Sequence, residues 1–221
     1  MTQNKISVIV EDIKEETPFV KSFKLSSNDG YELPIFSGGS YITTYIDLPN
    51  GETMVRTYSL INNSKKTGYY QIAIQLNEAS KGGSFYWHHH VKIGDCLQIS
   101  YPSNYFLLSF QAKHHVFFAT GIGITPFLSM IEEIEHNKET FELHYAAKSE
   151  NSCAFYQFLK SNYPDQVHFY FSEEGNRMDK DLLTNLPIDS HVYFCGTEEM
   201  INEFSQTAKA LGYPEKSIHF Y

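Results

Sequence analysis

Two features in the first half of the chain have the chemistry that phosphate binding requires. Arg56 is one of only two arginines among the 221 residues, and a guanidinium can grip a phosphate through two parallel hydrogen bonds, which lysine cannot copy. Further along, Gly82-Gly83-Ser84 opens an expected helix, whose free backbone N–H groups attract anions. Arg56 could instead form a surface ion pair, and the glycine pair a plain turn. Their occurrence in one small region favours a phosphorylated cofactor, and Tyr58 offers an aromatic plane for its ring unless it is a core tyrosine.

A second candidate site is a turn that joins a buried strand to a helix. The apolar run His115–Thr120 leads into Gly121-Ile122-Gly123, after which Thr125 is a suitable N-cap and Pro126 a favoured first helical residue. A strand that feeds a helix N-terminus can receive a phosphate or a nicotinamide coenzyme. Pro126 occupies the place where the common dinucleotide fingerprint has its third glycine. The turn is therefore a nucleotide loop of another kind, or a purely structural connection.

Charge and composition exclude several classes of partner. The net charge is −9, and residues 111–221 carry 8 basic against 16 acidic side chains, which argues against nucleic acid and anionic membranes. The chain has no long apolar run and no signal-peptide pattern at its start, so we expect a cytoplasmic protein. Cys96, Cys153 and Cys195 are odd in number and far apart, which indicates neither a disulfide framework nor a metal site.

The first half of the chain has the period of β-structure. Short alternating runs, separated by polar turns, predict antiparallel strands in a small barrel or sandwich. The dipeptide Asn50-Gly51 between two of these runs is a strong hairpin signal. The predicted strands cover 6–10, 19–25, 40–48, 54–61, 69–76 and 96–101, with a helix at 84–90.

The second half alternates strands with helices. This rhythm predicts βαβ units and a parallel sheet. The predicted strands cover 115–120, 141–147, 167–172, 191–196 and 217–221, and the predicted helices 126–136, 152–162 and 198–211. We therefore expect two domains, an antiparallel β-barrel at 1–109 and an α/β nucleotide-binding domain at 110–221.

Four motifs follow one another along the chain, namely Arg56-x-Tyr58-Ser59, Gly82-Gly83-Ser84, Gly121-x-Gly123-x-Thr125-Pro126 and Cys195-Gly196-x-x-x-Met200. Their order resembles that of the ferredoxin-reductase-like flavoprotein superfamily. Within it, the chain is most similar to the phthalate dioxygenase reductase family, which includes vanillate demethylase reductases and other reductase components of Rieske oxygenases. Supporting stretches, such as Phe36–Ile42 and Pro102-x-Asn104-x-Phe106, extend the resemblance over essentially the whole chain.

The resemblance implies an FMN in the barrel, with FAD the less favoured flavin, and an NADH in the α/β domain. Hydride would pass from nicotinamide C4 to flavin N5. Arg56, with Gly82, Gly83 and Ser84, would hold the FMN phosphate. The ring and ribityl chain would contact Thr57, Tyr58, Ser59, Ala73, Ile74 and Gln75, with Ser59 near the N5/O4 edge.

The resemblance also assigns the nicotinamide side. Thr125, in the turn with Gly121, Gly123 and Pro126, would lie between the two cofactors. Cys195 and Gly196 would bound the nicotinamide pocket, with Met200 behind them, although a buried structural cysteine is the alternative for Cys195. Ser59, Thr125 and Cys195 are thus the residues closest to the reacting atoms. No side-chain acid or base is required, because the cofactors carry the chemistry.

A few charged residues bear on the choice of coenzyme, and three adjacent histidines bear on metal binding. Glu173 follows the third predicted strand of the second half, where a carboxylate binds a ribose diol and repels a 2′-phosphate, which favours NADH. Lys148 is the counter-indication, and both could be solvated loop charges. His88, His89 and His90 are adjacent on a helix and cannot all ligate one ion, so we expect no metal site, and His88 packs near the phosphate loop.

Several departures from the family pattern concern electron transfer. Gln75 replaces a usual lysine, Ser103 a usual arginine and Thr197 a usual proline. Full-length family members continue into a plant-type 2Fe–2S domain, whose cysteine spacing is absent from this chain. Either the sequence is truncated before that domain, or the natural protein passes electrons to a separate acceptor, an oxygenase component or a ferredoxin. The alternatives are a stand-alone reductase of free flavin or another diffusible acceptor, and a non-catalytic nucleotide-binding partner.

Overall fold

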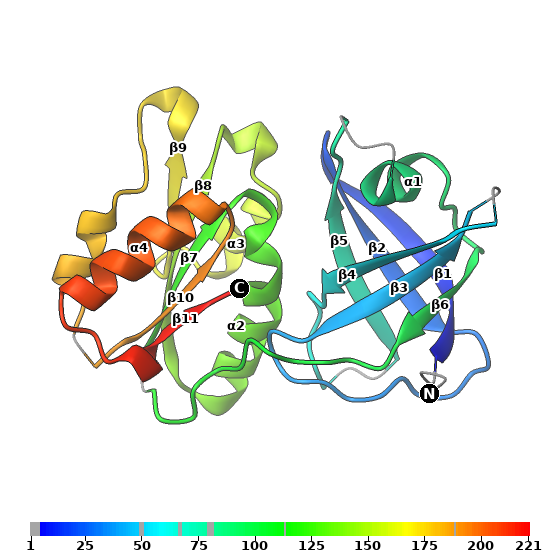
Figure 1. The fold of residues 1–221 in the computed structure, drawn as a ribbon, viewed down its shortest axis with the longest axis horizontal. Helices are drawn as coiled ribbons and strands as arrows, with labels where there is room; N and C mark the ends of the chain where they lie inside the picture. The colour runs from blue at the N-terminus through cyan, green and yellow to red at the C-terminus, as the bar shows by residue number, and fades with distance from the viewer. Residues whose placement is uncertain (1–4, 49–50, 66–67, 79–81, 113, 188) are drawn as a thin grey trace.

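The computed structural model describes residues 5–48, 51–65, 68–78, 82–112, 114–187 and 189–221. Two bodies lie side by side, an antiparallel β domain and an α/β domain, as the sequence predicts (Figure 1). Strand β6 ends at Ser100 and β7 begins at His114, so the chain crosses from one body to the other between them. The boundary at residue 109 remains a prediction within that segment.

The first domain is a six-stranded antiparallel sheet whose edges meet. The strand order is β4-β3-β6-β1-β2-β5, and an isolated bridge between Leu60 and Ile72 joins the two edge strands. The backbone N–H of Ile61 also donates to Gln71 O at 2.9 Å. The edges are thereby closed into the expected barrel, which removes exposed strand edges. Its elements are β1 (Lys5–Thr17), β2 (Val20–Ser27), β3 (Tyr41–Asp47), β4 (Thr53–Ser59), β5 (Tyr69–Gln75), α1 (Gly83–His89) and β6 (Cys96–Ser100).

The alternation that predicts these strands also builds the barrel core. Along β3 every second residue is buried, so one face of the strand points into the barrel. Strands β3 and β4 pair from Tyr41–Ser59 to Asp47–Thr53, which confirms a hairpin. Asn50, half of the predicted turn signal, lies outside the described residues.

The second domain is a five-stranded parallel sheet in the order β11-β10-β7-β8-β9. The central strand β7 is buried from His115 to Ala119, as expected for a strand covered on both faces. Helix α4 covers one face of the sheet and α2 faces the barrel (Figure 1). The elements are β7 (His114–Thr120), α2 (Thr125–Asn137), β8 (Thr140–Ala147), α3 (Tyr156–Asn162), β9 (Val167–Phe171), β10 (His191–Cys195), α4 (Glu198–Ala210) and β11 (Ile218–Phe220).

The helix predicted at 152–162 is shorter than expected. A 3₁₀ turn covers Glu150–Ser152, and α3 begins only at Tyr156. Phe155 lies between them in the left-handed region, with φ of 63°, and a residue in that conformation interrupts a right-handed helix. The sequence pattern of the segment therefore predicts the helix but not the residue at which it begins.

Two adjacent glycines hold the barrel against α2. The backbone N–H groups of Gly38 and Gly39 donate to Glu133 Oε2 and Ser129 Oγ at 2.5 and 3.1 Å. A Cβ on Gly38 would lie 2.8 Å from Met130 Cα, and one on Gly39, whose φ is +84°, would overlap Phe106 O. Because both positions lack side chains, the loop can approach the α2 backbone closely at Gly38 and the Phe106 backbone closely at Gly39.

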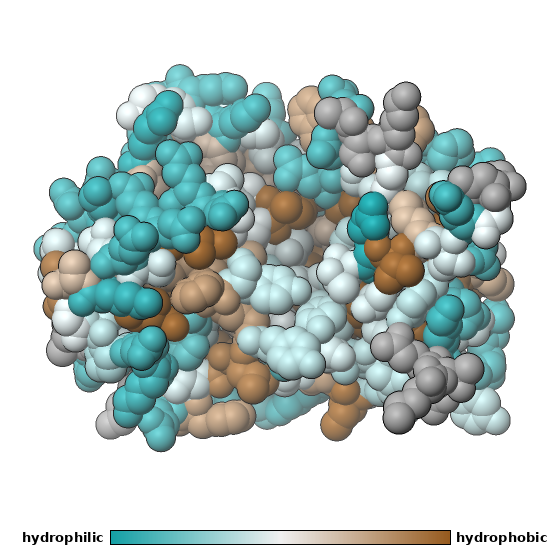
Figure 2. All heavy atoms as spheres, viewed as in Figure 1, coloured by the Kyte–Doolittle hydropathy of each residue, from teal (hydrophilic) through white to brown (hydrophobic). Residues whose placement is uncertain are grey.

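A shared apolar core continues this contact. Val20, Ile61 and Ala73 of the barrel pack in one cluster with Ile124 and Phe127 of the α/β domain. On the face shown in Figure 2 the surface over α4 is mainly hydrophilic, whereas the seam between the domains is a mixture of weakly hydrophilic, neutral and hydrophobic residues. The shared core holds the two domains against each other and so sets the relative position of their two candidate sites.

Candidate functional site

The two phosphate-binding features predicted in the barrel lie together. Arg56 is an exposed residue of β4, and Gly83 is the first residue of α1. A Cβ on Gly83 would lie 2.9 Å from Arg56 Cγ and 3.0 Å from its Nε, so the arginine side chain runs directly over the start of the helix. The guanidinium and the free N–H groups of the first helical turn thus face the same space. Ser84 Oγ accepts a hydrogen bond from Asn77 N at 3.1 Å, which ties this turn to the end of β5.

Tyr58 and Ser59 extend the site along β4. The half-buried Tyr58 ring packs edge-on against Trp87 of α1, with centroids 5.8 Å apart and an interplanar angle of 80°. Burial raises the pKa of the Tyr58 phenol to about 12, against the opposing effect of the Arg56 charge, so the ring is neutral at physiological pH. Ser59 pairs with Tyr41 at the end of the β3–β4 ladder, and Thr57 is exposed.

Strand β5 forms the second side of the candidate flavin site, and a hydrogen bond from His88 connects it to α1. Its residues Ala73 and Ile74 are buried, and Gln75 is exposed. His88 Nε2 lies 2.8 Å from Ile74 O, and burial lowers the pKa of this imidazole, so the neutral ring donates its Nε2–H to the carbonyl. His89 is exposed, which leaves the buried His88 in the packing role expected for it.

The glycine turn after β7 is a 3₁₀ turn, Gly121–Ile124, that runs directly into α2. The expectation that Thr125 caps α2 is wrong, because Ile124 is the N-cap and Thr125 already has helical dihedrals. Thr125 Oγ1 donates to Ile122 O at 3.0 Å instead, and Pro126 lies in the first turn as expected. Tyr145 OH donates to Gly121 O at 3.0 Å and supports the turn from β8.

The turn packs on the loop after β10. A Cβ on Gly123 would overlap Cys195 O and lie 2.7 Å from Gly196 Cα, so Gly123 is required for this contact. Cys195 is buried, and burial raises its thiol pKa to about 12, which keeps it protonated and excludes a thiolate nucleophile at neutral pH. Met200 is buried in the first turns of α4.

The barrel and the turn meet at the end of β5. The Oε1 atom of Gln75 lies 3.9 Å from the position that a Cβ on Gly121 would take. The strand predicted to line one cofactor therefore ends beside the turn predicted to receive the other.

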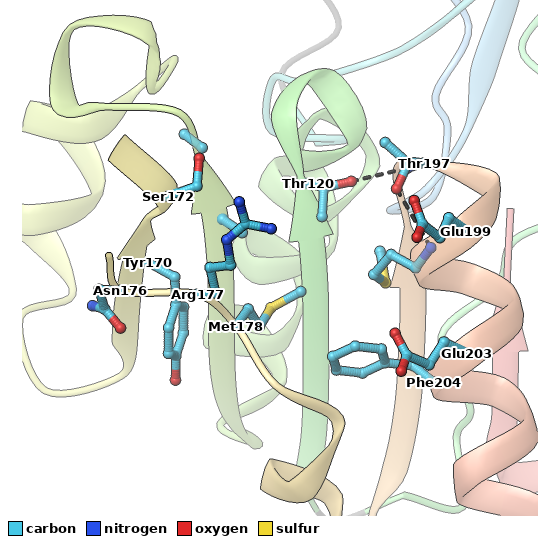
Figure 3. Close-up of a pocket in the computed structure, with 13 residues that line it drawn as sticks. Thr120, Tyr170, Ser172, Asn176, Arg177, Met178, Thr197, Glu199, Glu203 and Phe204 are labelled. Atoms are coloured by element: carbon cyan, nitrogen blue, oxygen red, sulfur yellow. Dashed lines mark hydrogen bonds between the residues drawn. The ribbon is translucent and has the colours of Figure 1, made fainter. Parts of the chain in front are cut away.

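A pocket of about 240 Å³ opens at the carboxyl edge of the parallel sheet (Figure 3). Arg177 extends its guanidinium over this pocket between Ser172 and Thr120, opposite Glu199 and Glu203. In open parallel sheets ligands bind at this edge. The lining residues are Thr120, Ala146, Ala147, Tyr170, Ser172, Asn176, Arg177, Met178, Thr197, Glu199, Met200, Glu203 and Phe204.

Two domain families match the chain. Residues 8–107 match the oxidoreductase FAD-binding domain, and residues 99–218 match the N-terminal domain of dimethylamine monooxygenase subunit DmmA-like proteins. The carnitine monooxygenase reductase subunit of Escherichia coli (strain K12) is 38% identical over 96% of this chain and 67% of its own length. The vanillate O-demethylase oxidoreductase of Acinetobacter baylyi is 36% identical over 97% and 67%.

A solved structure agrees with these relatives. The structure of phthalate dioxygenase reductase has a TM-score of 0.90 and 27% identity over 99% of this chain and 68% of its own. The chain belongs to the phthalate dioxygenase reductase family. This reductase is a flavoprotein oxidoreductase with sites for a flavin and NAD(P)H, and it spans about two thirds of the length of these relatives. No helix among its described residues is both long and apolar enough to cross a membrane.

The residues of this reductase fit a flavin phosphate. An arginine fork and a helix N-terminus converge where Gly83 leaves room, which is the donor set that a phosphate requires. Among the described residues, no group of three or more His, Cys, Asp or Glu could hold a metal ion.

Sequence reasoning did not single out Arg177, which lines the pocket at the sheet edge. Glu173 is exposed in a 3₁₀ turn and is not among the residues that line this pocket, and its role in coenzyme choice stays a prediction. The short 3₁₀ turn Ser172–Glu174 leaves Gly175 at φ of +77° and redirects the chain, which carries Arg177 back over the sheet edge. The scarcity of arginine in the sequence was the one signal that could have singled out Arg177.

Proposed function

We propose that the protein oxidises NADH by means of a bound FMN and passes the electrons to a 2Fe–2S centre that serves a Rieske-type oxygenase. The end of β5 carries this proposal, because Gln75 Oε1 lies 3.9 Å from the position that a Cβ on Gly121 would take, which puts the strand predicted to line the flavin beside the turn predicted to receive the nicotinamide. The names of the relatives, a carnitine monooxygenase reductase subunit and a vanillate O-demethylase oxidoreductase, support an oxygenase as the final acceptor. The 2Fe–2S centre would lie in a separate ferredoxin, in the oxygenase component, or in a domain outside this chain.

In this proposal the barrel binds and orients the flavin. Arg56 and the N–H groups at the start of α1 bind the phosphate, Tyr58 flanks the ring, and Ser59 lies near its reacting edge. The backbone of Ala73–Gln75 borders the ribityl chain, held in place by the hydrogen bond from His88. A bound flavin supplies the ability to accept a hydride and release single electrons.

The α/β domain would bind the coenzyme along its carboxyl edge. The turn Gly121–Ile124 and Thr125 would receive the nicotinamide beside the flavin, and Cys195 with Gly196 would bound it. The protonated Cys195 thiol adds an uncharged wall that excludes water without acting as an acid or base. Arg177 would bind the pyrophosphate, since its guanidinium has no hydrogen-bond or ion-pair partner among the described residues.

We propose NADH rather than NADPH because of two carboxylates in the pocket, in addition to Glu173 after β9. Glu199 and Glu203 both line the pocket, and carboxylates there favour a ribose diol and repel a 2′-phosphate. Glu203 is paired with Lys180 at 2.8 Å, which leaves Glu199 as the principal source of negative charge.

The test is anaerobic reduction of the purified yellow protein. We expect the flavin absorbance to bleach on addition of NADH, with a much higher kcat/KM than for NADPH, and we expect denaturation to release FMN. Release of FAD would contradict the choice of flavin. Loss of the flavin on desalting, together with NADH-dependent reduction of added flavin, would identify a stand-alone flavin reductase. Failure of NADH to reduce either bound or added flavin would contradict both enzymatic functions.

A further inference from the structure

A hydroxyl at the end of β7 holds the neighbouring loop in place. The parallel ladder between β7 and β10 ends at the pair Ala119–Cys195. Just beyond it, Thr120 Oγ1 accepts a hydrogen bond from the backbone N–H of Thr197 at 2.9 Å (Figure 3). A side chain thus continues the connection between the two strands where their backbone pairing stops.

The residue between these partners has no room for a side chain. A Cβ on Gly196, whose φ is +153°, would overlap Thr120 Oγ1 and lie 2.9 Å from Thr120 N. On its other side Gly196 contacts Gly123, whose own Cβ would lie 2.7 Å from Gly196 Cα. The loop Cys195–Thr197 is therefore confined between the Thr120 hydroxyl and the turn Gly121–Ile124.

Thr197 extends the link to α4. Its backbone N–H donates to Thr120, while its side-chain Oγ1 accepts from Met200 N at 3.4 Å as the N-cap of the helix. A proline at position 197 could form neither bond, because it has no N–H and no hydroxyl. Thr197 therefore connects the end of β7 to the start of α4 by two hydrogen bonds.

We propose that Thr120 is a positioning residue for the coenzyme. By accepting the Thr197 N–H, it fixes the loop Cys195–Thr197 against the turn Gly121–Ile124 and so sets where the nicotinamide lies relative to the flavin. Both threonines line the pocket at the sheet edge, so the link borders the space that the coenzyme would occupy (Figure 3). This inference rests on the proposed function, in which NADH binds there.

The Thr120→Val and Thr120→Ser variants of the flavin-loaded protein separate the hydrogen bond from the packing. Valine has the shape of threonine but no acceptor, whereas serine keeps the acceptor and loses only a methyl group. In Thr120→Val we expect the Thr197 amide to lose protection from hydrogen exchange and flavin reduction at saturating NADH to slow by about 10–100-fold, since a displacement of about 1 Å costs on the order of 100-fold. Thr120→Ser should keep both the protection and a rate close to that of the wild-type protein.

Three results would overturn the inference. The first is loss of Thr197 amide protection in Thr120→Val with an unchanged rate of flavin reduction, and the second is wild-type protection of that amide in the same variant. The third is slowing of both variants in proportion to a fall in melting temperature, which would indicate a general loss of stability. Failure of the wild-type protein to react with NADH would instead refute the proposed function, and so distinguishes the two.

Discussion

Replacing Gly83 with alanine should strengthen helix α1 while it weakens flavin binding. Gly83 has an ordinary φ at the first position of the helix, so alanine introduces no backbone strain, and it is favoured over glycine in helices by up to about 1 kcal/mol. Its Cβ, however, would lie 2.9 Å from Arg56 Cγ and 3.0 Å from Arg56 Nε. The arginine side chain must move away from the start of the helix to accommodate it.

The size of the effect follows from the bonds that Arg56 would lose. A hydrogen bond to a charged group contributes about 1.5–3 kcal/mol, so the flavin dissociation constant should rise by about 10–150-fold. Without flavin, the melting temperature should stay unchanged or rise by at most about 2–4 °C, the shift expected for about 1 kcal/mol in a chain of this length. Flavin fluorescence titration of the apoprotein measures the first quantity and calorimetry the second.

A matched control is Gly68→Ala, because Gly68 also has an ordinary φ and a Cβ there would meet nothing within 4 Å. That variant should bind flavin like the wild-type protein. Wild-type flavin affinity in Gly83→Ala would refute the assignment of Arg56 and the start of α1 to one phosphate site. A large loss of apoprotein stability would refute the helix argument.

Further predictions concern single side chains. Arg56→Lys should weaken flavin retention, because one ammonium cannot replace the fork, and unchanged affinity would remove Arg56 from the phosphate site. Arg177→Gln should raise the dissociation constant for NADH by about 10-fold or more with flavin content unaltered, as stopped-flow titration would show; equal NADH affinity would exclude the pyrophosphate role. Cys195→Ala should slow flavin reduction more than it lowers the melting temperature, and proportionate losses would favour a purely structural cysteine. Burial and the neighbouring His191 and His115 lower the pKa of His219 to about 4, so the unfolded chain, with a histidine pKa of about 6.5, takes up the proton first as the pH falls. Stability from His219 is thus present above about pH 6.5 and lost as the pH falls towards 4, and the free energy of urea unfolding should depend less on pH across this range in His219→Phe.

The sequence predicted those parts of the fold that depend on local periodicity. The alternation along β3 and the buried run of β7 each correspond to a strand in the predicted place, because burial on one or both faces requires those patterns. The sequence predicts that Arg56 and Gly83 both belong to phosphate-binding features. It does not predict their contact, because that contact depends on closure of the barrel, which no local pattern encodes.

The errors arise where the backbone departs from standard geometry. Thr125 was expected to cap α2, yet the preceding 3₁₀ turn already supplies helical dihedrals and moves the N-cap to Ile124. The sequence places Glu173 after a predicted strand but gives no periodic sign of Arg177, which the turn at Gly175 brings to the pocket. The hydrogen bond between Thr120 and Thr197 joins residues 77 positions apart, so no periodic pattern in the sequence could predict it.

The contact of Gly38 and Gly39 with α2 limits how the two domains can be exchanged between related proteins. The barrel contributes bare backbone at Gly38 and Gly39, and α2 contributes the Glu133 and Ser129 side chains that accept from it, so a change in one half must be matched by a change in the other. Hybrids that combine the barrel of one relative with the α/β domain of another should assemble only when loop and helix come from the same parent. The two halves are thus expected to have been exchanged between electron-transfer systems as a single cassette, whatever acceptor each system uses.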